Sequence, residues 1–150
     1  MGIVLVVPPA LFSITVHEAA HGFVAYMLGD NTPKVAGRLS LNPLNHIDPF
    51  GLLALIVTRV FGWAKPVPIN PYNFNNFKLG IFLVAISGPI SNFLLAVLLS
   101  QVLRLAIKIE PNLLVDIYSF MVGEGVFVKS FSGKILLPIV LMLFIAVVVN

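Results

Sequence analysis

The chain has 150 residues, of which 59% are hydrophobic and only 10% are charged, and its mean hydropathy is +1.03. Soluble domains carry roughly 25% charged residues, so this composition indicates an integral membrane protein. The net charge of +3 comes from nine scattered Lys and Arg residues and does not favour a nucleic-acid-binding protein, while the absence of cysteine excludes disulfides and thiolate metal sites.

Four apolar stretches predict an all-α, polytopic membrane protein with about three to four transmembrane helices in a single domain covering residues 1–150. The first stretch, residues 2–28, would form a helix about 40 Å long. It lacks the basic start and the cleavage site of a signal peptide, so we expect it to be retained. Pro8 and Pro9 are expected to kink this helix or delay its start, and Gly29 and Asp30 to end it.

The second stretch, residues 52–63, is too short to cross a bilayer and predicts a re-entrant or interfacial segment. A polar segment rich in Pro and Asn precedes it. Pro66, Pro68 and Pro71 follow it, and they predict a non-helical loop over residues 64–78 with the prolines in extended backbone.

The third stretch, residues 79–108, is long enough to span, with Gly88, Pro89 and Asn92 interrupting it near its centre. Residues 110–133 are mixed and predict a loop at the interface. The fourth stretch, residues 135–149, falls short of the ~20 residues of a span, which predicts a chain cut inside its last helix. Basic residues dominate between the first and third stretches, so the positive-inside rule places residues 30–78 on the cytoplasmic side of the cell membrane.

The candidate site is the pattern His-Glu-x-x-His at residues 17–21, inside the first predicted helix. Residues four apart share one helical face, so His17 and His21 can reach one metal ion, and neutral imidazoles suit Zn²⁺. Glu18 lies beside the ligand stripe, close enough to take a proton from a water activated by the metal. This chemistry is that of peptide hydrolysis.

A structural role must be weighed against this one, because a histidine in a helix usually has no ligand. Here, however, two of the chain's three histidines flank one glutamate. An ionisable group at bilayer depth also costs about 2.5–3.5 kcal/mol, which favours a functional role. The small residues Ala19, Ala20 and Gly22 further permit close helix approach or a water-filled cavity.

Several further stretches carry a resemblance. They are, in order, "HEAAHGFVAYMLGD", "GRLSLNPLNHIDPFG", "GWAKPVPINPYNF" and "ISGPISNFLLA". In these the chain resembles the site-2 protease family of intramembrane zinc metalloproteases, in its compact branch without a PDZ domain. The likeness covers residues 13 to about 97, roughly two-thirds of the chain.

The resemblance implies that the protein cleaves membrane-spanning or membrane-adjacent segments of another protein in the lipid bilayer. It implies that His17 and His21 bind one Zn²⁺ and that Glu18 is the catalytic base. The family's third ligand is an aspartate in a Leu-Asp-Gly motif, which this chain does not contain. We therefore expect that ligand beyond Asn150, and weak zinc binding or no catalysis by the chain alone.

Three further residues have two interpretations each. His46 and Asp48 either approach the metal as outer partners or belong to a loop held by Asx turns, which we favour. Asn92 either donates to a substrate or oxyanion, or braces two helices. The run "KPVPINP" is either a rigid loop or an extended edge to which a substrate strand adds.

Two other functions compete with proteolysis. One is a metal-binding transporter or channel in which the broken third helix lines a path, and this would require ligand-like groups spread along that path. The other is a non-catalytic relative, which would be expected to lack Glu18. A single cluster of ligand-like groups and the presence of Glu18 favour the protease.

Overall fold

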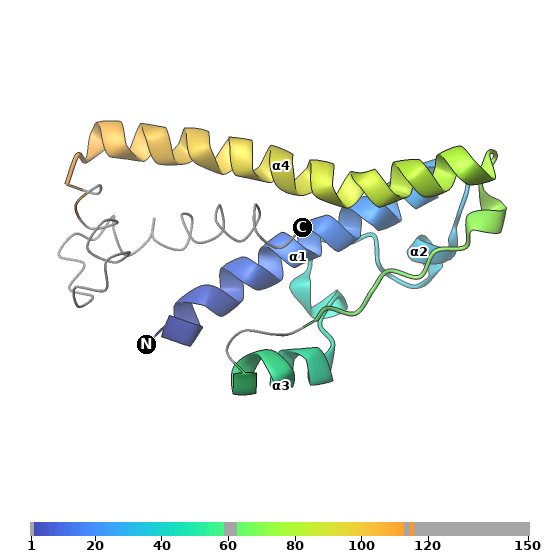
Figure 1. Cartoon of the computed structure of the whole chain (residues 1–150), viewed down its shortest axis with the longest axis horizontal. Helices are drawn as coiled ribbons and strands as arrows, with labels where there is room; N and C mark the ends of the chain where they lie inside the picture. Colours follow the sequence, from blue (N-terminus) through green and yellow to red (C-terminus); the bar gives the residue numbers. More distant parts are fainter. Residues whose placement is uncertain (1, 59–62, 113–114, 116–150) are drawn as a thin grey trace.

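The computed structural model of the chain describes residues 2–58, 63–112 and 115 (Figure 1). Its helices are α1 (Gly2–Met27), α2 (Thr32–Val35), the short 3₁₀ helix η1 (Pro43–Asn45), α3 (Pro49–Thr58), the 3₁₀ helix η2 (Pro71–Asn73) and α4 (Phe77–Ile109). The described residues contain no named strand and only one isolated β-bridge, between Ile47 and Ala64. The all-α prediction is therefore confirmed for this part of the chain, whereas the predicted fourth apolar stretch lies outside it.

Helix α1 begins at Gly2, so Pro8 and Pro9 do not delay its start. Both prolines lie beyond the first turn, so each removes one backbone donor of the helix, which nevertheless continues through them. The C-terminal end agrees with the prediction. Gly29 adopts a left-handed φ of 106°, and the amide of Asp30 then bonds to the carbonyl of Ala25 at 3.0 Å, which closes the last turn.

Helix α4 runs through Gly88, Pro89 and Asn92 without a break, so the predicted interruption is wrong. A proline removes only one backbone donor, and the apolar residues on both sides favour a continuing helix. Figure 1 shows α4 as one ribbon that bends where it passes α1. The side chain of Asn76 accepts the Leu79 amide at 3.1 Å, which explains why α4 starts two residues before the predicted Leu79.

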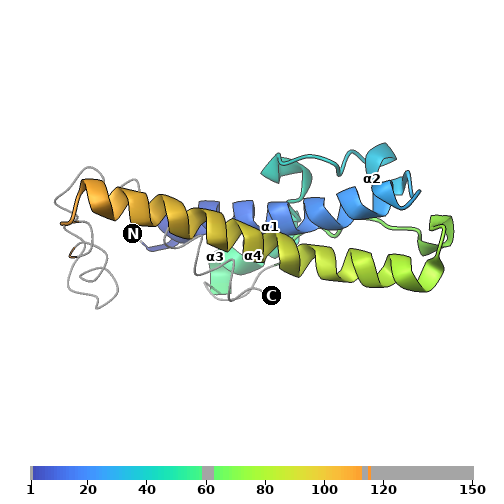
Figure 2. The same ribbon diagram turned by 90° about the horizontal axis from the view of Figure 1, so that it is seen from above.

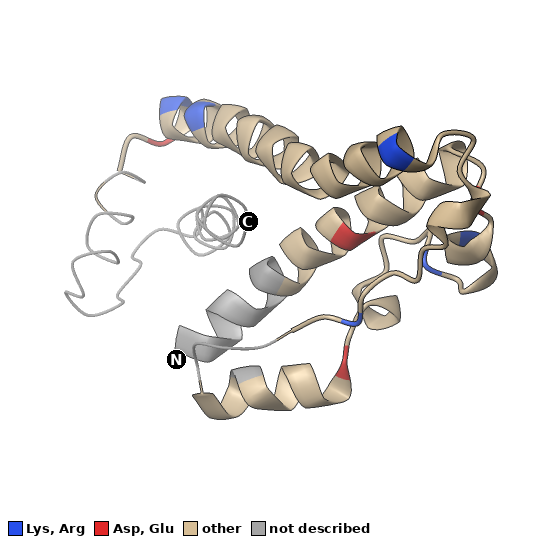
Figure 3. Cartoon of the chain, turned by 45° about the vertical axis from the view of Figure 1, so that its right-hand side comes forward, with Lys and Arg blue, Asp and Glu red and all other residues tan. Residues whose placement is uncertain are grey.

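Among the described residues, α4 alone is long and apolar enough to be identified as a candidate membrane span. Its 33 residues reach about 50 Å. Many of its large apolar side chains, including those of Phe82, Phe93 and Leu98, are exposed, as expected for a surface that faces lipid. Figure 3 shows charged residues only near the two ends of α4, with a long uncharged stretch between them. The other predicted spans remain predictions.

The two long helices lie side by side where the second half of α1 meets the first half of α4 (Figures 1 and 2). A small cluster of buried apolar residues, formed by Ala25, Phe74 and Val84, fills the space between α1, the end of η2 and α4. This packing places residues 17–21 of α1 opposite residues 84–92 of α4.

The predicted proline-rich loop is non-helical over residues 64–70. Its start pairs with the segment before α3, because the Lys65 amide donates to the carbonyl of His46 at 2.8 Å. The prediction is wrong at the other end, where Pro71 begins η2. There the side chain of Asn70 accepts the Tyr72 amide at 3.2 Å, and a proline fits the first position of a helix.

Candidate metal and catalytic site

The imidazoles of His17 and His21 lie on one face of α1, and both face α4, as the four-residue spacing predicts. Their ring centroids are 4.7 Å apart, with the planes nearly perpendicular. Both rings lie against Gly88. A Cβ built there would be 2.5 Å from His17 Nε2 and 2.6 Å from His21 Cε1. The close approach of the two rings to α4 therefore depends on a residue without a side chain.

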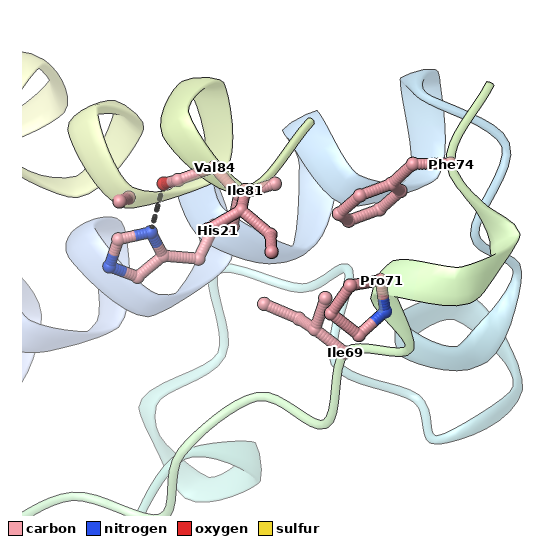
Figure 4. Close-up of a pocket in the computed structure, with 7 residues that line it drawn as sticks. His21, Ile69, Pro71, Phe74, Ile81 and Val84 are labelled. Atoms are coloured by element: carbon pink, nitrogen blue, oxygen red, sulfur yellow. Dashed lines mark hydrogen bonds between the residues drawn. The ribbon is translucent and has the colours of Figure 1, made fainter. Parts of the chain in front are cut away.

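The tautomer of His21 follows from its partner on α4. Its Nδ1 lies 2.7 Å from the carbonyl oxygen of Val84 (Figure 4). A carbonyl only accepts hydrogen bonds, so Nδ1 carries the proton and donates it. In the neutral ring Nε2 then keeps its lone pair, which is the form that binds a metal. The hydroxyl of Ser87 also donates to the Val84 carbonyl, at 2.7 Å.

The partner of His17 is Asn92, one turn further along α4 from Gly88. The side-chain nitrogen of Asn92, Nδ2, lies 3.2 Å from His17 Nδ1, and Asn92 is only 2% exposed. A side-chain amide offers a donor or, after a half-turn, an acceptor at the same place. Asn92 can therefore hold His17 with a proton on Nδ1 and a free lone pair on Nε2, the arrangement that His21 already has.

Glu18, the residue after His17, meets the proline-rich loop. Its Oε2 accepts the backbone amide of Val67 at 3.1 Å. Val67 lies between Pro66 and Pro68, which have no N–H, so its amide is the sole donor of these three residues. The Val67 side chain is buried, and its Cγ1 lies 3.1 Å from the position of a Cβ on Gly22. The small residue at position 22 thus lets the loop come close to the carboxylate.

The loop is held at its other end by Asp30. One carboxylate oxygen accepts the Asn70 amide at 2.7 Å, and the other accepts the Asn73 side chain at 2.8 Å and the Thr32 amide at 3.0 Å. Burial alone would raise the pKa of this fully buried carboxyl, but the hydrogen bonds from Thr32, Asn70 and Asn73 outweigh burial and lower the pKa below its ordinary value of 3.8.

These anchors bear on the predicted substrate edge. The amides of Lys65, Val67 and Asn70 donate to His46, Glu18 and Asp30 respectively. They are therefore already used within the chain and are not available to pair with an added strand. These three bonds fix the loop against the rest of the chain and place the Val67 amide on Glu18, while the substrate-edge interpretation stays a prediction.

His46 and Asp48 bond elsewhere. The Nε2 of the buried His46 lies 2.9 Å from the carbonyl of Ser40, which ties the loop to itself. The side chain of Asp48 accepts the amides of Phe50 and Gly51, both at 2.9 Å, and so caps the start of α3. These are the loop and Asx roles that the sequence favoured for both residues.

Within the part of the chain that the structure describes, no group of three or more His, Asp or Glu residues is arranged to hold a metal ion. His17 and His21 are the two nitrogen donors that come together. Glu18 lies beside them, engaged with Val67 on another face of the helix.

The comparisons with known proteins agree with this chemistry. The chain is similar to proteins named as zinc metalloproteases. It is 50% identical over 86 residues to "Putative zinc metalloprotease YwhC" of Bacillus subtilis, an alignment covering 57% of this chain and 39% of that protein. It is 34% identical over 106 residues to "Putative zinc metalloprotease Rip2" of Mycolicibacterium smegmatis, covering 67% and 40%. The chain thus spans about two-fifths of the length of these relatives. No family model and no solved structure matches it.

Sequence reasoning missed three contributors to the site. Val67 acts through its backbone amide, and its side chain has no catalytic or ligating group. The one signal in the sequence was its position between two prolines, which have no N–H of their own. Asp30 appeared to be an ordinary helix stop, although an aspartate after "LG" can also anchor a following loop. Gly88 was noted only as a helix breaker, whereas it provides the space for both imidazoles.

Proposed function

We propose that this protein is a membrane-embedded zinc endopeptidase of the site-2 protease type, which hydrolyses peptide bonds in or near transmembrane segments of other proteins. The observation that carries the proposal is the convergence of His17 and His21 on Gly88, with both Nδ1 atoms engaged by α4. The similarity to two proteins named as zinc metalloproteases supports it.

The residues present fit zinc. Two imidazoles on one face are a common half of a zinc site, and the hydrogen bond from His21 to Val84 leaves a nitrogen lone pair for the ion. When bound, zinc would make a water more acidic and polarise the substrate carbonyl. We propose that His17 and His21 hold the ion and that a further protein ligand comes from outside the described residues.

Glu18 is proposed to be the base. One of its oxygens accepts the Val67 amide, so the carboxylate is held in one orientation while the other oxygen can take a proton from the attacking water. The same carboxyl then gives this proton to the nitrogen of the departing amine. The loop thereby contributes to catalysis by fixing the base.

The proposed setting is a multi-pass protein of the cell membrane. The length and uncharged middle of α4 support this, as does the exposure of its apolar side chains. Residues 30–78 are proposed to lie on the cytoplasmic side, because Lys34, Arg38, Lys65 and Lys78 exceed the acidic residues there. The proposed partner is a membrane protein or peptide substrate.

The competing transporter function is not favoured. It relied on a broken third helix lining a path, and α4 is continuous through Pro89. The two imidazoles of α1 also lie together against Val84 and Asn92 of α4 instead of being distributed along a path.

The test measures zinc content and cleavage of a synthetic transmembrane peptide together, in this chain and in a longer form that continues past Asn150. Glu18→Gln should keep zinc and lose cleavage, because it removes the base but no ligand. His17→Ala should lose both. Full cleavage by Glu18→Gln, or unchanged zinc content in His17→Ala, would contradict the proposal. Asp48→Ala serves as a control, since it removes a carboxylate that caps α3 instead.

A further inference from the structure

An apolar cavity opens directly beside His21. Its volume is about 330 Å³. The proline-rich loop and η2 supply Ile69, Pro71 and Phe74, and α4 supplies Ile81, Val84 and Ala85 (Figure 4). Phe74 and Val84 are buried, whereas Ile81 and Ala85 lie exposed on α4. The cavity is therefore bounded by two segments that follow each other closely in the chain, residues 69–74 and 81–85, and by one of the two proposed zinc ligands on α1.

The lining of this cavity is almost entirely hydrocarbon. Its one polar member is His21, whose Nδ1 is already bonded to the Val84 carbonyl. A charged or strongly polar group placed here would lose its hydration without gaining a partner. The volume lies at the lower end of the range for ligand pockets, which suits one large side chain better than a whole cofactor.

We propose that this cavity binds one large apolar side chain of the substrate segment, next to the peptide bond that is cleaved. This inference rests on the proposed function and specifies its substrate class. The cavity is continuous with the proposed site because His21 belongs to both. Membrane-spanning segments consist mainly of residues such as Leu, Ile, Phe and Val, so a site that acts on them meets such side chains at nearly every position.

The first experiment changes the size of the cavity. Ala85→Phe fills it, and Ile81→Ala enlarges it; Ala106→Phe and Ile90→Ala are matched changes on α4 outside the cavity. Synthetic transmembrane peptides carry Ala, Leu or Trp at each position flanking the cleaved bond in turn. We expect wild type to favour Leu over Ala at one position by about tenfold or more in kcat/KM. Ala85→Phe should reverse that preference, and Ile81→Ala should favour Trp.

The second experiment uses the absence of cysteine from the chain. Ala85→Cys introduces a single thiol at the cavity, and Ala106→Cys introduces one on the same helix away from it. A peptide whose one cysteine, in its apolar stretch, is carried as a mixed disulfide with thiopyridine should exchange with the thiol of the first variant, releasing thiopyridine, and much less with the second. Excess peptide with Leu at that position should compete, and peptide with Asp there should not.

The outcomes distinguish a failure of this inference from a failure of the proposed protease function. If wild type binds zinc and cleaves, but all cavity variants keep the wild-type preference and Ala85→Cys cross-links no better than Ala106→Cys, the cavity holds something else, such as a lipid chain or another segment of this protein, and the inference is overturned. If neither the chain nor its longer form cleaves any peptide while Ala85→Cys still cross-links selectively, the proposed function fails and the binding site stands.

Discussion

Replacing Gly88 with alanine is the sharpest test of how α4 builds the site. Alanine in a helix interior is normally favoured over glycine by about 1 kcal/mol, so the substitution should stabilise α4 if nothing else changed. At this position, however, the new Cβ would lie 2.5 Å from His17 Nε2 and 2.6 Å from His21 Cε1. Ordinary contact begins near 3.4 Å. The two rings must therefore move by about 1 Å, or the helices must separate by a similar amount.

Such a displacement is small for folding and large for metal binding. Overpacking costs roughly 1–3 kcal/mol and the helix preference of alanine offsets about 1 kcal/mol of it, so Gly88→Ala should lose about 0–2 kcal/mol of stability. Metal ligands tolerate errors of only about 0.2 Å. We therefore expect at least tenfold weaker binding, which corresponds to about 1.4 kcal/mol.

The assay is titration with Co²⁺ followed by its visible absorption, with zinc as competitor, alongside thermal unfolding in detergent micelles. Gly80→Ala is the matched control, because its Cβ would meet the ring of Phe74 and not the histidines. It should lose stability and keep the metal affinity of the wild type. If Gly88→Ala binds Co²⁺ as tightly as wild type, the histidines do not converge at Gly88 and the reasoning is wrong.

Four further predictions follow from the same contacts. Asn92→Leu should weaken Co²⁺ binding by about 10–100-fold, whereas Asn92→Asp, which supplies an acceptor to His17 Nδ1, should bind nearly as wild type in the same titration. Asp30→Asn should lower stability by about 2 kcal/mol at neutral pH. The pKa of Asp30 is lowered in the folded protein, so the stability that its carboxylate contributes is present above pH 3.8, the ordinary pKa, and is lost as the pH falls below that value. Measuring the free energy of unfolding between pH 3 and 7 tests this. Asp48→Ala should cost about 0.5–2 kcal/mol of stability through α3 and leave Co²⁺ binding unchanged. A longer form continuing past Asn150 should bind zinc more tightly than this chain, as measured by competition with a chelator. Equal affinity would place the third ligand within residues 1–150.

Much of the fold and of the candidate site could be predicted from the sequence, because local patterns determine the helices and the spacing of the two histidines. Apolar length predicts all four ends of α1 and α4 to within two residues, and the His-Glu-x-x-His spacing alone puts two imidazoles on one face. The contacts of Glu18 could not be predicted in this way. Its partner Val67 is 49 residues away and acts through a backbone amide, so no side-chain pattern records it. The continuity of α4 through Pro89 was also missed, because proline in an apolar helix is less disruptive than local rules imply.

The two proposed zinc ligands and the proposed base lie on one helix, α1, but their side chains are oriented by two different segments. Successive residues turn by about 100° around a helix, so Glu18 is rotated by about 100° from His17 and about 60° from His21 and can meet a different neighbour. The histidines are accordingly oriented by α4, through Val84 and Asn92, and the glutamate by the proline-rich loop, through Val67. Changes in α4 should then act first on metal affinity, and changes in the loop first on the base. The five-residue motif supplies the chemical groups, and the two segments packed on either side of it supply their orientation.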